Sequence, residues 1–411
     1  MDIEVHRAGR TFYAHTTVLL NIPDRRLDRF FSIREWAAIV AAKFLDMPEV
    51  ASQTLTDYIN IHQERDQGTG LSEADLDKLL ERKIRGELTA EQFVQEIQML
   101  RKIRGRERKE SSTSAIVQAL VQRTGVAWPV WENTGQEMLE AVMPMEIGNS
   151  REARPGSSAV QLARQMGILT PVLVSDYPMI TATYGYSRAD YRPNQCQLNP
   201  FPPHPDYNGK YPIFVDQIQA DALLIRLDPN RVLTWLERNG CRPLLPNGTD
   251  LELACKAYFV ELFNDVSLRE TIYADRREAR MVFGLLHTLC HLSIRQTALL
   301  CGLDLTSLSE YLLPRTLTFA IYCNHRFGAT IGALTALFEQ SLAEWLHAIK
   351  ETRRCVYDPL CRDKSGNCHA CTHLSETSCR FYNLNLSRAF LFGGNDTEIG
   401  NISIGYFDQS L

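Results

Sequence analysis

Residues 355–379 read CVYDPLCRDKSGNCHACTHLSETSC and hold five of the eleven cysteines in this 411-residue chain. Cys368 and Cys371 form a CxxC pair, with Cys361 seven residues before the pair and Cys379 eight residues after it. Four thiolates enclose Zn²⁺ as a tetrahedron, and one tight CxxC turn supplies two adjacent corners. The spacing therefore predicts a zinc-binding module over residues 355–379, with these four cysteines as ligands.

The predicted ligand shell is closed. Four thiolates leave no coordination position for a water molecule that the metal would activate, so the module is expected to be structural. Cys355 is a candidate extra ligand, and His369 and His373 are reserves within the same stretch.

The composition predicts a globular cytoplasmic protein. The chain is 45% hydrophobic, and neither an export signal nor a run of about 18 uncharged apolar residues is found in it, so we expect no membrane contact. Without export, cysteines are better explained as metal ligands or buried thiols than as disulfides. Buried free thiols are predicted for the six cysteines outside the module: Cys196, Cys241, Cys255, Cys290, Cys301 and Cys323.

One basic segment stands out in a chain whose formal net charge is −5. Residues 101–109 read RKIRGRERK, and a net acidic chain restricts any DNA contact to such a local patch. The candidate DNA contacts are Arg101, Lys102, Arg104, Arg106, Arg108 and Lys109. The segment has no aromatic residue for base stacking, and the alternative interpretation is a solvated helix end.

The hydrophobic pattern predicts an α+β fold that is mainly helical, with a small mixed sheet and the C-terminal cysteine-rich module. Strands are expected at residues 12–22, 168–174, 213–227 and 317–322, and helices at 229–239, 250–263, 276–301, 304–312 and 330–349. Three domains are expected. They are residues 1–150 with an inserted helical hairpin at 67–125, a mixed α/β domain at 151–279, and a C-terminal domain at 280–411 that contains the module.

His287 and His291 form the motif HTLCH, which places two imidazoles one helical turn apart. Metalloproteases use this spacing, but the glutamate that acts as their general base is missing here. Two alternatives remain open: histidines satisfied in the core, or a metal pair completed by a carboxylate from elsewhere. The chain contains no GxxxxGK[ST], DExx, GxSxG, HExxH or GxGxxG motif, so we do not expect an enzyme.

A longer stretch from His287 resembles a known family. It reads HTLCHLSIRQTALLCGLDLTSLSEYLLPRTLTFAIYCN and is followed by CHACTHLSETSCRFYNLNLSRAFL. Over about residues 280–393 this sequence is similar to the MrfA-type zinc-binding (MZB) domain, found in certain superfamily 2 DNA helicases and in companion proteins that lack the helicase. The paired histidines, the LxE turn at 308–310, the apolar strand and the cysteine cluster occur in the family's order.

Two further stretches narrow the resemblance. YPIFVDQIQADALLIRLDPNRVLTWLERNG and NCHACTHLSETSCRFYN are most similar to the DrmB group, companions of the DrmA helicase in the DISARM antiphage system. The resemblance implies a non-catalytic accessory subunit that docks on a superfamily 2, DrmA-like helicase, supports its grip on DNA, and binds zinc through the four cysteines. The alternatives are a metal-dependent nuclease or hydrolase that uses His287 and His291, and a stand-alone DNA-binding protein.

Overall fold

The computed structural model describes most of the chain. The described residues are 13–21, 25–33, 35–47, 115–146, 149–187, 198–248, 250–264, 276–324, 332–375 and 378–411, with short stretches between 55 and 99. The expected helical hairpin at 67–125 therefore lies largely outside them. None of the described helices has the length and apolar character that crossing a bilayer requires.

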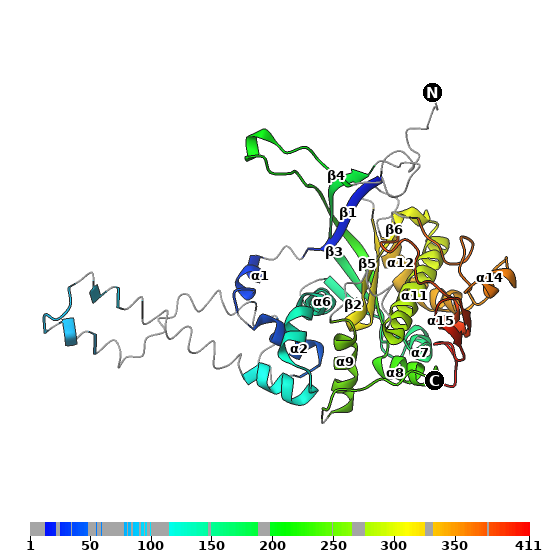
Figure 1. The fold of residues 1–411 in the computed structure, drawn as a ribbon, viewed down its shortest axis with the longest axis horizontal. Helices are drawn as coiled ribbons and strands as arrows, with labels where there is room; N and C mark the ends of the chain where they lie inside the picture. The colour runs from blue at the N-terminus through cyan, green and yellow to red at the C-terminus, as the bar shows by residue number, and fades with distance from the viewer. Residues whose placement is uncertain are drawn as a thin grey trace.

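A seven-stranded sheet forms the centre of the described structure (Figure 1). The strand order is β1-β3-β5-β7-β6, with β2 and β4 paired to β3, and each pairing is antiparallel. The strands are β1 (Tyr13–Leu20), β2 (Asn149–Glu152), β3 (Val172–Ser187), β4 (Leu198–Pro200), β5 (Phe214–Arg226), β6 (Leu308–Leu313) and β7 (Thr318–Cys323). A separate hairpin joins β8 (Gly394–Asp396) and β9 (Gly400–Ile402).

Helices cover both faces of this sheet (Figure 1). Their bounds are α1 (Arg25–Phe30), α2 (Trp36–Phe44), α6 (Trp128–Glu146), α7 (Ser158–Gln165), α8 (Pro229–Arg238), α9 (Leu251–Leu262), α11 (Arg277–Cys301), α12 (Ala333–Gln340), α13 (Leu342–Lys350), α14 (Leu360–Asp363) and α15 (Ala389–Phe392). The Asp228 side chain caps α8, and Gly302 ends α11 with a φ of 64°. The sequence predicted both of these signals.

The central strands are buried on both faces. Leu223 and Ile225 of β5 pack in the main core with α11, while Ala222 and Leu224 pack on the opposite face near α6. Successive side chains of a strand point to opposite faces, so an almost continuously apolar strand is required here. The main core therefore places α11 directly against β6 and β7.

The α+β class predicted from the sequence is confirmed, but two details differ. The sheet is neither small nor mixed, because β3 continues through sixteen residues where the apolar run at 168–174 predicted a short strand. The expected helix at 304–312 is only a 3-10 turn at Leu305–Ser307 followed by β6. Asp304 does cap the turn, but pairing of β6 with β7 overrides the helical signal.

The segment after α15 crosses α8. Arg231 donates hydrogen bonds to the carbonyl oxygen of Tyr406, and Trp235 Nε1 donates to the carbonyl oxygen of Ile404 at 2.9 Å. Asn239 both donates to and accepts from the backbone of Ile404. This segment thus completes the main core.

An arm projects from the far ends of β3 and β5 (Figure 1). Several large apolar side chains on it are exposed to solvent: Leu198, Tyr207, Tyr211, Ile213, Phe214 and Val215. We call residues 198–216 the β-arm. Such a gathering of exposed apolar groups is unusual for a surface without a partner.

Candidate metal centres

Four cysteine sulfurs come together at the C-terminal side of α13. Cys355, Cys361, Cys368 and Cys371 place their Sγ atoms within 4.8 Å of one another. Three of the sulfur pairs, 355–368, 361–371 and 368–371, lie 3.6 Å apart. Sulfurs at the corners of a tetrahedron around zinc, with Zn–S bonds of about 2.3 Å, would lie about 3.8 Å apart. The four-cysteine cluster therefore has the dimensions of a metal site.

The local backbone explains how the cluster is assembled. Cys361 lies in the short helix α14, and Cys368 and Cys371 flank a turn in which the Cys371 N–H donates to the Cys368 carbonyl at 3.1 Å. Between Cys361 and Cys368 the chain reverses at Ser365 and Gly366, which have φ values of 65° and 61°. A side chain at Gly366 would also approach Arg388, with 3.1 Å between the added Cβ and the Arg388 Cβ. Glycine fits both constraints.

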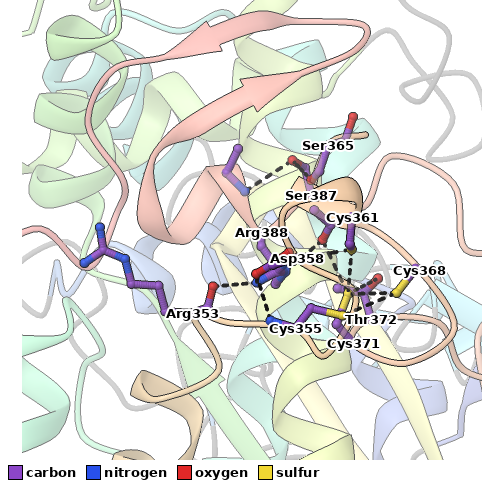
Figure 2. A network of polar contacts seen from close by, with 12 residues as sticks. Arg353, Cys355, Asp358, Cys361, Ser365, Cys368, Cys371, Thr372, Ser387 and Arg388 are labelled. Atoms are coloured by element: carbon purple, nitrogen blue, oxygen red, sulfur yellow. Dashed lines mark hydrogen bonds and ion pairs between the residues drawn. The ribbon is translucent and has the colours of Figure 1, made fainter. Parts of the chain in front are cut away.

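Arg388 ties the cluster to the rest of the chain (Figure 2). Its guanidinium forms a two-pronged ion pair with Asp358, with one N–O distance of 2.6 Å, and donates to the carbonyl oxygens of Gly366 and Arg353. It also lies 3.6 Å from the Cys361 sulfur. A planar guanidinium suits this arrangement because its donors are fixed in a fork.

The thiols of the cluster differ in how readily they ionise. Burial raises the pKa of both Cys361 and Cys371. Burial also opposes ionisation of Cys368, but hydrogen bonds from the Cys361 thiol and the Ala370 N–H outweigh it and lower the pKa of Cys368 to about 7. Cys368 is therefore the thiolate available at neutral pH, and a bound cation would favour ionisation of the others.

The ligand set differs from the sequence expectation at one position. Cys379 does not lie with Cys361, Cys368 and Cys371; Cys355, the candidate extra ligand, occupies the fourth corner. Spacing alone did not separate the two, because both cysteines lie within ten residues of another member of the cluster. His369 and His373 belong to neither metal-type group in the described residues, and their ring centroids lie 4.6 Å apart.

Cys379 instead joins the paired histidines. His287, His291, Glu310 and Cys379 place one donor atom each within 4.8 Å of the others, and all four residues are buried. The two histidines come from α11, Glu310 comes from β6, and Cys379 follows the four-cysteine cluster. His291 Nε2 lies 3.1 Å and His287 Nε2 3.5 Å from the Glu310 carboxylate, and His287 Nε2 lies 3.4 Å from the Cys379 sulfur.

The environment of this second group perturbs its members. Burial lowers the pKa of His287 and raises the pKa of the Cys379 thiol. Burial also opposes ionisation of Glu310, but the neighbouring His287 and His291 rings hold the pKa of this carboxyl well below its usual range. The group therefore favours an ionised carboxylate beside imidazoles, which is an arrangement that could hold a metal ion.

Sequence reasoning named the two histidines and Cys379 but missed that Glu310 completes their group. Glu310 stands in the LxE turn of the family resemblance, yet nothing in its immediate sequence marks it as a ligand. Its burial becomes evident only in the structure, where Glu310 is the single carboxylate in a run of six buried strand residues. An acidic side chain in such a run requires a compensating partner.

The remaining candidates from the sequence are the cysteines outside the module and the basic residues of segment 101–109. Cys241, Cys255, Cys290 and Cys323 are buried free thiols, as predicted, whereas Cys301 is a free thiol that is only half-buried. Cys196 lies outside the described residues, as do all six basic candidates for DNA contact: Arg101, Lys102, Arg104, Arg106, Arg108 and Lys109.

Comparison with known proteins finds a distant relative. The chain is 25% identical over 205 residues to the DISARM protein DrmB of Bacillus paralicheniformis, and the match covers 44% of this chain and 33% of that protein. The match thus spans about a third of the relative's length. No family model matches the chain, so the assignment to the MZB family stays a prediction. The similarity supports at most a distant, DrmB-like relationship over the matched part of the chain.

Proposed function

We propose that this protein is a non-catalytic, zinc-containing accessory subunit of a DISARM-type antiphage complex, which docks on a superfamily 2, DrmA-like helicase and supports its hold on DNA. The observation that carries the proposal is the similarity to DrmB. The order of the histidine pair, the buried strand and the cysteine cluster adds support from the C-terminal part of the chain.

The four-cysteine cluster supports a structural role for its metal. Its ligands are four sulfurs, and a shell of this kind has no vacant position for substrate. Arg388 and Asp358 connect it to the main core, so a bound zinc would stabilise the position of residues 355–372 rather than perform chemistry.

The β-arm is the described surface that best suits a protein partner. Ile213, Phe214 and Val215 are each more than half exposed, and their apolar area would be removed from water when a second subunit covered them. We therefore assign helicase docking to the β-arm.

The test is co-purification with the DrmA-like helicase from the same type of defence system, together with ATPase assays. The isolated chain should show no ATPase activity, and the helicase should be retained by the tagged chain and hydrolyse ATP faster on DNA in its presence. The double variant Ile213→Ser, Phe214→Ser should lose retention of the helicase. Because these side chains are exposed, the variant should keep its folding stability and zinc content.

The matched control is Leu299→Ser, which removes an apolar side chain that is 74% exposed and belongs to α11 rather than to the β-arm. Retention of the helicase should be unchanged in this variant. ATP hydrolysis by the isolated chain would refute the non-catalytic role, and failure of the unmodified chain to retain any such helicase would refute the accessory role. Equal retention by the β-arm variant and the control would refute only the docking surface.

A further inference from the structure

The second group of buried ligands has an inner side faced by two imidazole nitrogens, one carboxylate oxygen and one thiol sulfur. His287 Nδ1 lies 2.9 Å from the Leu384 carbonyl oxygen, and His291 Nδ1 lies 2.8 Å from the Thr372 carbonyl oxygen. A carbonyl oxygen can only accept, so each Nδ1 carries the proton. In neutral imidazoles this leaves both Nε2 lone pairs directed toward Glu310.

The other two members are oriented in the same way. Glu310 Oε1 accepts a hydrogen bond from the Arg380 N–H at 2.9 Å, which leaves Oε2 on the inner side. The Cys379 sulfur accepts from the N–H groups of Phe381 and Asn383 at 3.4 and 3.3 Å, an environment that stabilises a thiolate. Each side chain is thus fixed from outside by the backbone, as ligands of bound metals are.

Two atoms on the inner side are unsatisfied without a cation. His291 Nε2 and Glu310 Oε2 are 3.1 Å apart, yet neither atom has a hydrogen-bond partner among the described residues. Both side chains are fully buried. Bringing a carboxylate and a nitrogen lone pair together away from water is unfavourable unless a proton or a metal lies between them.

We propose that His287, His291, Glu310 and Cys379 bind a second zinc ion, separate from the ion of the four-cysteine cluster. Imidazole, carboxylate and thiolate are all zinc ligands, and the carboxylate and thiolate together neutralise the charge of Zn²⁺. Binding releases the proton of the Cys379 thiol and leaves no net charge in the core.

The second site is structural rather than catalytic. Its four ligands complete a tetrahedron, and their complete burial leaves no path for substrate or for an exchanging water. The nuclease alternative required His287, His291 and a carboxylate around a metal ion with a vacant coordination position. Glu310 supplies the carboxylate, but four protein ligands leave no coordination position vacant. The ion instead joins α11, β6 and the segment around Cys379.

The two sites are connected through the backbone. Thr372 follows Cys371 of the four-cysteine cluster, and its carbonyl accepts the hydrogen bond from His291 of the second site. The second zinc would therefore anchor the four-cysteine cluster against α11, independently of the proposed role in a helicase complex.

The test begins with elemental mass spectrometry and zinc-edge X-ray absorption on the full-length chain after removal of loosely bound metal. We expect two zinc ions per chain, with an average shell of about 2.5 sulfur and about 1.5 nitrogen or oxygen ligands, because one site is all sulfur and the other mixed. One zinc per chain with a shell of sulfur alone would overturn the proposal, and would mean that protonated histidines neutralise Glu310.

Variants then assign each ion. Glu310→Gln retains the shape of the side chain but removes its charge, and should lower zinc content from two to one and shift the average shell toward four sulfurs. Cys368→Ser should also lower the content to one, but shift the shell toward nitrogen and oxygen. The control Cys301→Ser removes a thiol that belongs to neither site and should keep both ions. Two ions retained in Glu310→Gln with an unchanged shell would also overturn the proposal.

Discussion

Gly284 of α11 lies against the Phe390 ring of α15, and replacing this glycine with alanine tests the packing that supports both metal sites. A Cβ atom at this position would lie 2.4 Å from Cε2 and 2.7 Å from Cζ of Phe390, and 3.0 Å from the Asn385 carbonyl oxygen. Carbon atoms in normal contact are about 3.5–4.0 Å apart. Phe390 is fully buried and packs edge-on against Trp235, so its ring has little space to move.

Two opposing effects determine how much Gly284→Ala changes the free energy of unfolding. Alanine in a helix interior is favoured over glycine by about 1 kcal/mol, which would stabilise the variant. Overpacking in a filled core costs about 1–3 kcal/mol, and the contacts here, with a buried ring and a backbone carbonyl, place Gly284→Ala at the upper end of that range. We therefore expect a net loss of about 2 kcal/mol in the free energy of unfolding.

The assay is urea unfolding of the zinc-loaded protein, followed by tryptophan fluorescence and circular dichroism. The midpoint for Gly284→Ala should fall while the slope of the transition is unchanged. Adding Phe390→Leu should relieve the overlap, so that the double variant is more stable than the sum of the single changes predicts by at least about 1 kcal/mol. A Gly284→Ala variant as stable as the unmodified protein would refute the reasoning, because the helix preference would then have prevailed.

Three other substitutions test separate parts of the structure. Arg388→Met removes the partner of Asp358 and the donor to Gly366, and should weaken zinc binding by the four-cysteine cluster about 10–100-fold in chelator competition; unchanged affinity would contradict the role of Arg388. Glu140→Gln tests a group whose pKa burial raises, so its ionisation opposes folding. The free energy of unfolding of the variant should equal that of the unmodified protein below pH 4.5 and exceed it increasingly as pH rises toward 8. A difference in the free energy of unfolding that does not change with pH would contradict this. Asn239→Ala removes hydrogen bonds to the Ile404 backbone and should cost about 1–3 kcal/mol in thermal unfolding, whereas the exposed change Leu299→Ala should cost under about 0.5 kcal/mol.

Local signals in the sequence were sufficient for much of the fold. Asp228 and Gly302 marked the correct ends of α8 and α11, because side-chain caps and left-handed glycines act within a few residues. The strand β5 was also predicted, since its apolar run lies between clear turn residues. The C-terminal cysteines were recognised as a metal-type cluster because a CxxC turn is itself a local structure.

The missed features depend on contacts between distant segments. Whether Cys355 or Cys379 joins the cluster is decided by where α11 places His287, about ninety residues earlier in the chain. Glu310 was assigned to a short helix, and only its pairing partner β7 makes that segment a strand. Local propensity contains no information about either partner.

The position of the segment after α15 has a consequence for how the protein is synthesised. Trp235 and Arg231 emerge from the ribosome well before Ile404 and Tyr406, to which they are hydrogen-bonded in the folded protein. β5 likewise cannot pair with β7 until β7 has been translated, about a hundred residues later. Loop-closure entropy delays such distant contacts, so the side of α8 that faces Ile404 and Tyr406 stays uncovered until those residues have been translated. The nascent chain is therefore expected to depend on chaperones until its C-terminal segment is available.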